Sequence, residues 1–534
     1  GAAQTEHQII AQFFGQRANY IETSYHFFQA ANYDRALDIL KARKEKLLFA
    51  GQSPAALEML DEARKNAYIG EGVSNDWRMK ELELRGEWLQ LSGKYPEAED
   101  NFKKILELSD FPPETLSARI RRRRGENALY QGNLDDAKAH LLRAVKLFEE
   151  SQNTDDFNPL EEGIARYWLG RIYFLQGSDF DAAENHSSRA LELFNQINAL
   201  RWQLRAENTL ATLRFVKGDL PAGIQKLEAI IAKVEDAGLT LSPEAAIVYD
   251  NLGTAYYLQQ KYKDSIKYYQ ESLDIADKIG WLYQSAKTRS SVNLVYIQLG
   301  RWKEAIENSQ KALEAYTITG DKMGEFYARN GLGIIAHRSG KLTEAQKVFL
   351  KCYNLAKEQN YQVEQIIAMN NLGLLYNDMV REGLEYLDRA QQLSQEIEND
   401  EFDIETFTAQ AHIKTKLGQL DSALEDAQKA LNLAEDWEDN YLIGQSKIAL
   451  GAVYIELGRY DEAEDALQNA IEVLEKDLYE KGKAVLYLGR LFARSGQEAQ
   501  ARIKLQEAIE IFESIKVSWL KERAQAEIQH LNKQ

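Results

Sequence analysis

The sequence Leu252-Gly253-Thr254-Ala255-Tyr256, followed by a turn at Gln260-Lys261-Tyr262 and by Ser265, Tyr269 and Ser272, decides the fold. Its small residue, Gly253, stands seven positions before the turn, and the same arrangement returns at intervals of about forty residues. We call these recurring small residues the anchors: Gly86, Gly125, Gly170, Ala211, Gly253, Asn293, Gly333, Gly373, Ala411, Gly451 and Gly489. A period of ~20–50 residues is typical of a solenoid built from stacked units. The pattern therefore predicts one long array of repeats.

The composition predicts that the array is all-α. The chain has 534 residues, more than a single hydrophobic core normally supports. It contains only 7 Pro, while the strong helix formers Leu, Ala, Glu, Lys and Gln are abundant throughout. A quasi-one-dimensional stack of helices accommodates both the length and the composition.

Other repeats share the features of the first one. Leu450-Gly451-Ala452-Val453-Tyr454 precedes Gly458, Ala463, Leu467 and Ala470, and Leu169-Gly170-Arg171-Ile172-Tyr173 precedes Gly177, Ala183 and Ala190. This pattern resembles the tetratricopeptide repeat in its long form of about forty residues. The resemblance implies an all-α, right-handed superhelical solenoid of about twelve stacked antiparallel helix pairs. It also implies that the chain binds other molecules and is not an enzyme.

The small residues have a physical role in this interpretation. An anchor without a large side chain lets the two helices of a repeat cross closely. The turn glycines suit the left-handed backbone conformation that ends the first helix. They are Gly93, Gly132, Gly177, Gly218, Gly300, Gly340, Gly418, Gly458 and Gly496.

The pattern lapses in three places. After Gly373 the sequence Asn377-Asp378-Met379 has no turn glycine and Ala390 comes two residues early, which predicts a shortened turn. Residues 46–76 lack the regular pattern and are expected to form an irregular helical insert. Val517 to Leu531 reads as a single amphipathic helix that caps the last repeat. We therefore expect an N-terminal helical segment at 1–76, a regular array at 77–516 and a capping helix at 517–534.

Chemistry-bearing motifs are scarce. The seven His show no ligand spacing typical of a metal site, and no Gly-x-x-x-x-Gly-Lys-[Ser/Thr] loop occurs. The single cysteine, Cys352, stands where other repeats place Ala, so a buried packing role is expected rather than a reactive thiol. We predict no catalytic residue, no metal and no cofactor.

The composition, the charge and the first residues of the chain indicate its location and its partners. No apolar run of about eighteen residues could span a bilayer, and one cysteine excludes an intrachain disulfide. A cytoplasmic location is the expectation, with no membrane partner. The formal net charge of −18 disfavours direct contact with nucleic acid. Because the chain begins Gly1-Ala2-Ala3 without Met, we expect a fragment of a larger protein, with a possible upstream nucleotide-binding domain.

The concave face of the array is where a ligand is expected to bind. First-helix residues six before, three before and one after each anchor line this face in tetratricopeptide repeats. The candidate site residues chosen by this rule are Arg119, Arg122, Glu126, Tyr167, Arg171, Arg205, Asn208, Asp250, Lys287, Asn330 and Asn370.

Two interpretations of these candidates remain open. The arginines could bind an anionic ligand or acidic peptide through their planar fork of donors. They could instead pair with glutamates of neighbouring repeats, for example Glu83 or Glu161, which would leave no charge for a ligand. The asparagines could likewise hold a peptide backbone or bond between repeats.

Two functions therefore remain for the chain. The segment from Tyr25 to Leu37 resembles the start of the superhelical sensor in the maltose-responsive class of STAND signal-transduction ATPases. That resemblance implies a sensor arm that recognises a protein, a peptide or a small anionic ligand. The alternative is a free-standing scaffold that assembles a protein complex in its groove.

Overall fold

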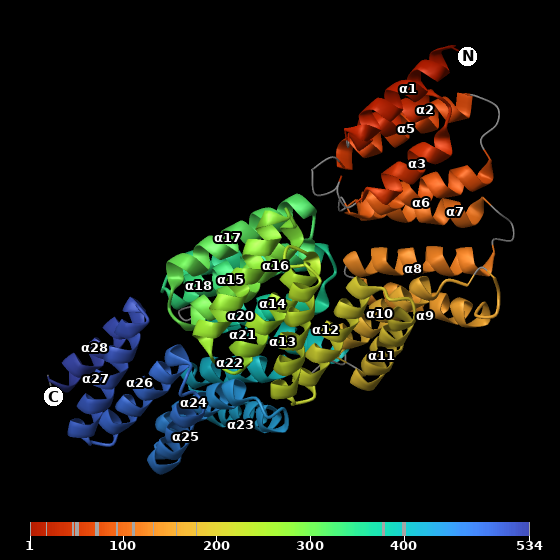
Figure 1. Ribbon diagram of the computed structural model, residues 1–534. Coiled ribbons are helices and arrows are strands. Elements are labelled where there is room, and N and C mark those ends of the chain that lie inside the picture. Colours follow the sequence, from red (N-terminus) through yellow and green to blue (C-terminus); the bar gives the residue numbers. More distant parts are fainter. Residues whose placement is uncertain are drawn as a thin grey trace. The chain divides into compact units, whose positions relative to one another are not determined.

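The computed structural model describes residues 2–17, 19–44, 47, 53–69, 74–91, 94–108, 113–131, 133–155, 157–177, 179–375, 380–397 and 402–532. All regular secondary structure in these ranges is helical (Figure 1). The contacts divide the chain into two compact units, and each is described by itself. The N-terminal unit comprises residues 1–255, 270–284 and 319–321, and the C-terminal unit comprises 256–269, 285–318 and 322–534.

The first helices of the chain are one helix pair and two additional helices. They are α1 (Ala2–Gln16), the pair α2 (Tyr20–Gln29) and α3 (Tyr33–Ala42), and α5 (Ser53–Ile69). The pairs that follow are α6 (Asn75–Leu91) with α7 (Tyr95–Glu107), α8 (Glu114–Tyr130) with α9 (Leu134–Glu150), α10 (Pro159–Gln176) with α11 (Phe180–Gln196), and α12 (Leu200–Val216) with α13 (Leu220–Asp236).

The division between the units passes through the next two pairs, α14 (Pro243–Leu258) with α15 (Tyr262–Lys278) and α16 (Leu282–Gln298) with α17 (Trp302–Thr319). The C-terminal unit continues with α18 (Lys322–Arg338) and α19 (Leu342–Glu358), α20 (Gln362–Leu375) and α21 (Val380–Glu396), and α22 (Asp403–Lys416) and α23 (Leu420–Asp436). It ends with α24 (Asn440–Leu457) and α25 (Tyr460–Val473), α26 (Leu478–Arg494) and α27 (Glu498–Ser514), and the single helix α28 (Ser518–Leu531). The predicted all-α solenoid of about twelve helix pairs is thereby confirmed.

The anchors pack as the sequence predicts. A Cβ atom built on Gly333 would lie 2.4 Å from the Phe349 ring, and one on Gly451 would lie 2.6 Å from Leu467. Such distances are well inside van der Waals contact, so the backbone of the first helix touches a side chain of the second. Larger residues at these positions would force the two helices of a pair apart.

The turn glycines have the predicted left-handed conformation wherever they are described. Their φ angles are positive at Gly177, Gly218, Gly300, Gly340, Gly418, Gly458 and Gly496. Gly93 and Gly132 lie outside the described residues. In the repeat of Gly253, which has no turn glycine, Gln260 takes the same conformation with a φ of 57°.

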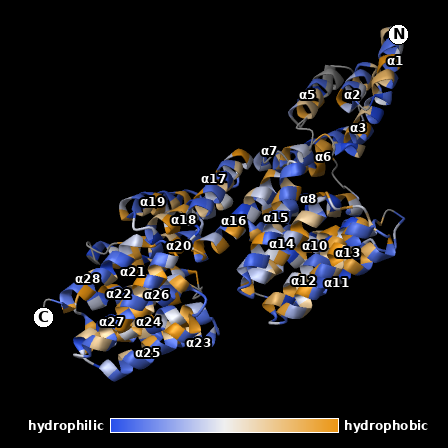
Figure 2. Cartoon of the chain, turned by 60° about the vertical axis from the view of Figure 1, so that its left-hand side comes forward, coloured by the Kyte–Doolittle hydropathy of each residue, from blue (hydrophilic) through white to orange (hydrophobic). Residues whose placement is uncertain are grey.

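Helix length explains the long repeat. Both α12 and α13 have 17 residues, so a pair with its connecting turns occupies about forty positions. Apolar and polar residues alternate along the helices, as the mixed colouring of Figure 2 shows. The buried apolar residues form clusters between adjacent helices, such as one that joins α8, α9 and α10 and another that joins α24 to α28.

The structure bears differently on the three places where the sequence pattern is interrupted. The turn after Gly373 falls in residues 376–379, which lie outside the described residues. A Cβ on Gly373 would nevertheless meet Leu387, fourteen positions later, whereas Gly451 and Leu467 are sixteen apart. The residue of the second helix that meets the anchor therefore comes two positions earlier in this repeat than in the repeat of Gly451. The region of the predicted insert contains α5, and α28 follows the last pair with Trp519 half-buried.

Candidate functional site

The predicted arginines of the N-terminal unit are held mainly by glutamates of neighbouring repeats. On α8, Arg122 is almost fully buried and donates from Nε to Oε2 of Glu161 and from Nη1 to Oε1 of Glu126, both at 2.5 Å. Burial alone would lower the pKa of Arg122, but these two carboxylates raise it. Arg119 is more exposed, and its Nε lies 3.0 Å from Oε1 of Glu83. Internal pairing, one of the two interpretations left open by the sequence, therefore holds for Arg119 and Arg122.

A further set of charges extends this network toward the N-terminus. Glu87 of α6 is buried and pairs with both Arg123 of α8 and Lys44. Burial would raise the pKa of Glu87, but the two cations lower it to about 2. A buried charge that is paired on both sides stays ionised, and its bonds tie successive repeats together.

Arg205 of α12 is paired in the same way. Its Nε donates to Oε1 of Glu244 at 2.8 Å, and its guanidinium lies 4.7 Å from the centre of the Trp202 ring. Three of the four predicted arginines thus have a carboxylate partner.

Arg171 of α10 is the exception. Its Nη1 donates to Oη of Tyr167 at 3.3 Å, and its guanidinium lies 5.7 Å from the centre of the Trp168 ring. In the described part of the chain, Arg171 has no carboxylate within ion-pair distance. The neighbouring Tyr167 oxygen raises the pKa of Arg171, so the side chain remains charged.

Aromatic rings surround this arginine. Tyr167 and Trp168 meet edge to face with centroids 5.1 Å apart, and Tyr130 of α8 lies 5.9 Å from Trp168. On the other side, Tyr167 contacts the Trp202 ring at 5.6 Å. Such rings offer large apolar area at low entropic cost, which is why they are frequent in binding surfaces.

A row of exposed apolar side chains lies on the same helices. Tyr130, Leu175 and Val216 each stand five residues after an anchor, on α8, α10 and α12, and are 42, 51 and 46% exposed. On an α-helix this position lies on the same side as those one after and six before the anchor. The sequence rule omitted it, although the recurrence of apolar residues there is visible in the sequence.

The predicted amides bond between repeats. Asn251 of α14 donates to Oδ1 of Asn208 at 2.9 Å, and Asn371 of α20 donates to Oδ1 of Asn330 at 2.9 Å. Oδ1 of Asn370 accepts from Thr406 of α22 at 2.9 Å. These bonds join consecutive first helices.

The two remaining candidates belong to different units. Asp250 is buried on α14, and its backbone carbonyl accepts from Thr254. Lys287 is half-buried on α16 in the C-terminal unit. The structure thus gathers Arg122, Glu126, Tyr167, Arg171 and Arg205 on neighbouring helices of the N-terminal unit, while Lys287, Asn330 and Asn370 belong to the C-terminal unit.

The C-terminal unit has an inner cluster that the sequence interpretation missed. Arg338 at the end of α18 lies 4.5 Å from the centre of the Tyr479 ring at the start of α26. Lys483 pairs with Glu480 at 2.7 Å, and His412 of α22 stacks on Tyr487. His412 and Lys483 stand one after and six before their anchors, so the same positional rule finds them once it is continued beyond Asn370.

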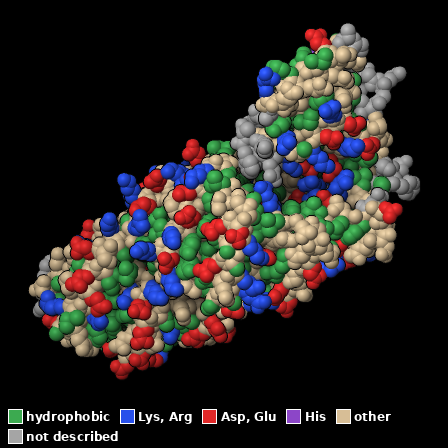
Figure 3. All heavy atoms as spheres, viewed as in Figure 1, with side chains coloured by type: hydrophobic (Ala, Val, Ile, Leu, Met, Phe, Trp, Pro, Cys, Tyr) green, Lys and Arg blue, Asp and Glu red, His purple; other side chains and the backbone are tan. Residues whose placement is uncertain are grey.

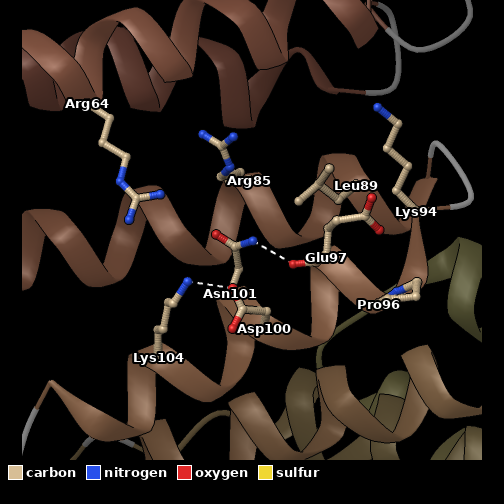
Figure 4. Close-up of a pocket in the computed structure, with 9 residues that line it drawn as sticks. All are labelled: Arg64, Arg85, Leu89, Lys94, Pro96, Glu97, Asp100, Asn101 and Lys104. Carbon is tan, nitrogen blue, oxygen red and sulfur yellow. Dashed lines mark hydrogen bonds and ion pairs between the residues drawn. The ribbon is translucent and has the colours of Figure 1, made fainter.

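A pocket opens between α5 and the pair α6 and α7. It has a volume of about 520 Å³ and is lined by Arg64, Arg85, Leu89, Lys94, Pro96, Glu97, Asp100, Asn101 and Lys104 (Figure 4). Two of its cations have carboxylate partners, since Arg85 pairs with Asp61 and Lys104 with Asp100, both at 2.5 Å. Its lining therefore combines both signs of charge. The face drawn in Figure 3 is similar, because basic and acidic side chains are interspersed on it.

Cys352 lies in the core of the C-terminal unit with Phe326, Ala356 and Ala368. Burial raises the pKa of its thiol to about 12. Within the described ranges, no three His, Cys, Asp or Glu side chains gather as a metal site requires. Among the described helices, none combines the length and apolarity needed to cross a bilayer.

Comparison with known proteins finds a relative that matches part of the chain. Hsp70-Hsp90 organizing protein 2 of Arabidopsis thaliana is 25% identical over 244 residues, which cover 41% of this chain and 40% of that protein. The chain thus matches less than half the length of this relative.

Solved structures resemble the chain at low sequence identity. A Rap protein complexed with Competence and Sporulation Factor has a TM-score of 0.48 and 14% identity, covering 68% of this chain and 98% of its own. NprR in complex with its cognate peptide NprX has a TM-score of 0.45 and 17% identity, covering 64 and 98%. A signal-transduction ATPase with numerous domains and a tetratricopeptide repeat sensor, from Pyrococcus horikoshii, has a TM-score of 0.43 and 16% identity, covering 91 and 74%.

Family profiles match the repeats themselves. One profile described as tetratricopeptide repeat matches residues 202–278, 288–358, 402–476 and 442–514, and a second with the same description matches 122–196. Together these matches cover more than half of the chain, which therefore belongs to the tetratricopeptide repeat family.

Proposed function

We propose that the chain is a non-enzymatic binding module that takes an extended peptide or protein segment on the concave face of its N-terminal unit. The observation that carries this proposal is the environment of Arg171, a charged side chain that lies among aromatic rings and has no carboxylate partner among the described residues. An acidic side chain of the bound segment supplies the missing partner. The exposed row of Tyr130, Leu175 and Val216 receives apolar side chains of the same segment.

The physical case rests on the contrast with the paired arginines. Arg119, Arg122 and Arg205 already satisfy a carboxylate, so a ligand would have to displace that partner. Arg171 needs no displacement, and a charge-assisted hydrogen bond beside aromatic rings is stronger than one in open water. Aromatic and Arg side chains are also the types that dominate binding energy in known interfaces. The ligand is therefore acidic at one position and apolar at its neighbours.

We further propose that binding here serves signalling, with the chain as the ligand-sensing arm of a larger STAND-type protein. The resemblance of residues 25–37 to such a sensor supports this role. The alternative is a scaffold that holds two partners in a complex, and it uses the same surface. Sequencing the complete natural gene separates them, since an encoded ATPase domain supports the sensor and an open reading frame without one supports the scaffold.

Binding to an array of short synthetic peptides tests the surface directly. One set of peptides varies the number of acidic residues and another varies the apolar residues at neighbouring positions. We expect the wild-type protein to select peptides that combine both, and Arg171→Gln to lose that selection. Arg189→Gln is the matched control, because Arg189 lies on α11, is exposed and pairs with Glu192. Equal binding by all three proteins would refute the proposed site.

A further inference from the structure

Two histidines join the first helix of the chain to the second. Nδ1 of His7 on α1 and Nδ1 of His26 on α2 lie 2.8 Å apart, which is hydrogen-bond distance. The centres of the two rings are 5.1 Å apart. A neutral imidazole has one ring nitrogen that donates and one that accepts, whereas an imidazolium can only donate. The hydrogen bond between the two Nδ1 atoms therefore requires at least one neutral ring.

The ring of His26 is enclosed by other rings. Its side chain is 13% exposed, the Phe14 ring of α1 stacks on it at 5.7 Å, and Tyr25 meets it edge to face at 5.2 Å. His7 and Phe14 are about two turns apart on α1, so they lie on the same side of that helix. Because both of them contact His26, this ring lies at the centre of the attachment of α1 to α2.

The same side of α1 covers apolar residues of α2. Ala11, which lies between His7 and Phe14 in the sequence, is fully buried in one cluster with Phe27 and Phe28 of α2. Burial of such side chains is what a terminal helix contributes to a stack of repeats. Release of α1 would therefore uncover part of this apolar cluster.

The surroundings of His26 favour its neutral form. Burial and the nearby His7 lower the pKa of His26 from its ordinary value of 6.5, and Glu22, 3.9 Å from Nε2, opposes them only in part. Glu22 belongs to α2 itself, so it does not hold α1. Helices α3 and α5 also pack against α2, and none of their described side chains adds a charge that acts on His26. On α1, the exposed Glu6 directly precedes His7.

We propose that the pair of His7 and His26 is a pH-sensitive catch, which holds α1 on α2 near neutral pH and releases it on acidification. Below about pH 6 both rings tend to bind a proton. Both Nδ1 atoms are then donors, so the hydrogen bond is lost and two positive charges face each other. The attachment is therefore strongest above pH 6.5 and weakens as the pH falls below that value. The catch is independent of the peptide surface around Arg171.

Hydrogen–deuterium exchange of the full chain at about pH 7.5 and about pH 5.5 tests this catch. The rates are corrected for the effect of pH on the intrinsic exchange of an amide. We expect the amides of α1 to exchange at least about tenfold faster at the lower pH, the factor that corresponds to one unit of pKa shift. Protection should return when the sample is brought back to the higher pH. Equal corrected rates in α1 at the two pH values would overturn the proposal.

Variants separate the histidine pair from a general effect of acid. His7→Phe keeps a ring against His26 but binds no proton, so α1 should stay protected at both pH values. His140→Phe is the matched control, because His140 is a half-buried histidine of the same unit on α9, and α1 should keep its full pH response in this variant. Circular dichroism at the higher pH checks that each variant is folded. An undiminished pH response of α1 in His7→Phe would contradict the proposal.

Discussion

Nε of Arg122 donates to Oε2 of Glu161 at 2.5 Å, joining α8 to α10 across two consecutive repeats. The guanidinium is almost fully buried, and within the described residues its lost hydration is compensated by Glu161 and Glu126. Removing one partner of such a pair leaves an uncompensated buried charge.

Glu161→Gln is therefore expected to destabilise the N-terminal unit by about 3–5 kcal/mol. Urea unfolding followed by circular dichroism measures the loss. Glu192→Gln is the control, because the exposed pair of Glu192 with Arg189 contributes at most about 1 kcal/mol. Equal effects of the two substitutions would show that the Arg122 pair contributes no more than a surface one.

Gly333→Ala tests the close packing of the anchors. The new methyl group would overlap the Phe349 ring, and we expect a loss of about 1–3 kcal/mol from this overpacking. Thermal unfolding checks the prediction. The double variant Gly333→Ala with Phe349→Leu should recover part of the loss, since Ala211 and Leu227 occupy these two positions in another repeat. A double variant less stable than the single one would argue against steric overlap as the cause.

Trp519→Phe tests the contact between α28 and the end of α18, where Trp519 packs against Gly340 and donates to the carbonyl of Arg338. The substitution keeps an aromatic ring but removes the N–H that donates to the carbonyl of Arg338. Hydrogen exchange is expected to accelerate in α28 and around Gly340, because the contact between them is weakened. Trp437→Phe is the control, as Trp437 is largely exposed at the end of α23. Unchanged exchange in Trp519→Phe would mean that this hydrogen bond does not hold the two segments together.

Two buried histidines predict an acid sensitivity of the C-terminal unit. Burial, assisted by Lys483, lowers the pKa of His337 to about 4 and that of His412 to about 3, from an ordinary value of 6.5. The folded chain keeps both rings neutral, whereas the unfolded chain binds protons below pH 6.5. Stability from these groups is therefore fully present above pH 6.5 and is lost as the pH falls toward 4.

His412→Phe is expected to reduce this loss while preserving the stacking with Tyr487. Chemical unfolding at several pH values between 6.5 and 4 compares the variant with the wild type. Parallel pH profiles for the two proteins would show that His412 does not titrate in this range on unfolding.

Cys352 is predicted to be unreactive in the folded protein. Its thiol is buried and its pKa is raised to about 12, so little thiolate forms near neutral pH. Ellman's reagent should modify it only when denaturant is added. Rapid modification in native buffer would show that the surrounding core opens readily.

The regular part of the fold could be predicted from the sequence because each repeat uses the same few residues. Gly177 and Gly458 end their helices in the predicted left-handed conformation, and Gly333 and Gly451 touch the second helix as expected. Even the shift at Gly373 was visible, since Ala390 comes two residues early. Local steric requirements determine all of these features.

The candidate site was only partly predictable. A positional rule finds Arg122 and Arg171 equally, but only the structure shows that Glu161 pairs with one and that aromatic rings surround the other. The contact between Arg338 and Tyr479 joins residues more than a hundred positions apart. Such contacts depend on how the superhelix coils, and nothing local in the sequence encodes that.

Hydrogen–deuterium exchange with a peptide selected from the array tests the central claim most directly. If the segment binds beside Arg171, protection should appear in the first helices α8, α10 and α12, which carry Tyr130, Leu175 and Val216. The second helices α9, α11 and α13 should remain unchanged, and the protection should vanish in Arg171→Gln. Protection confined to the second helices, or identical protection in Arg171→Gln, would contradict the proposed binding surface.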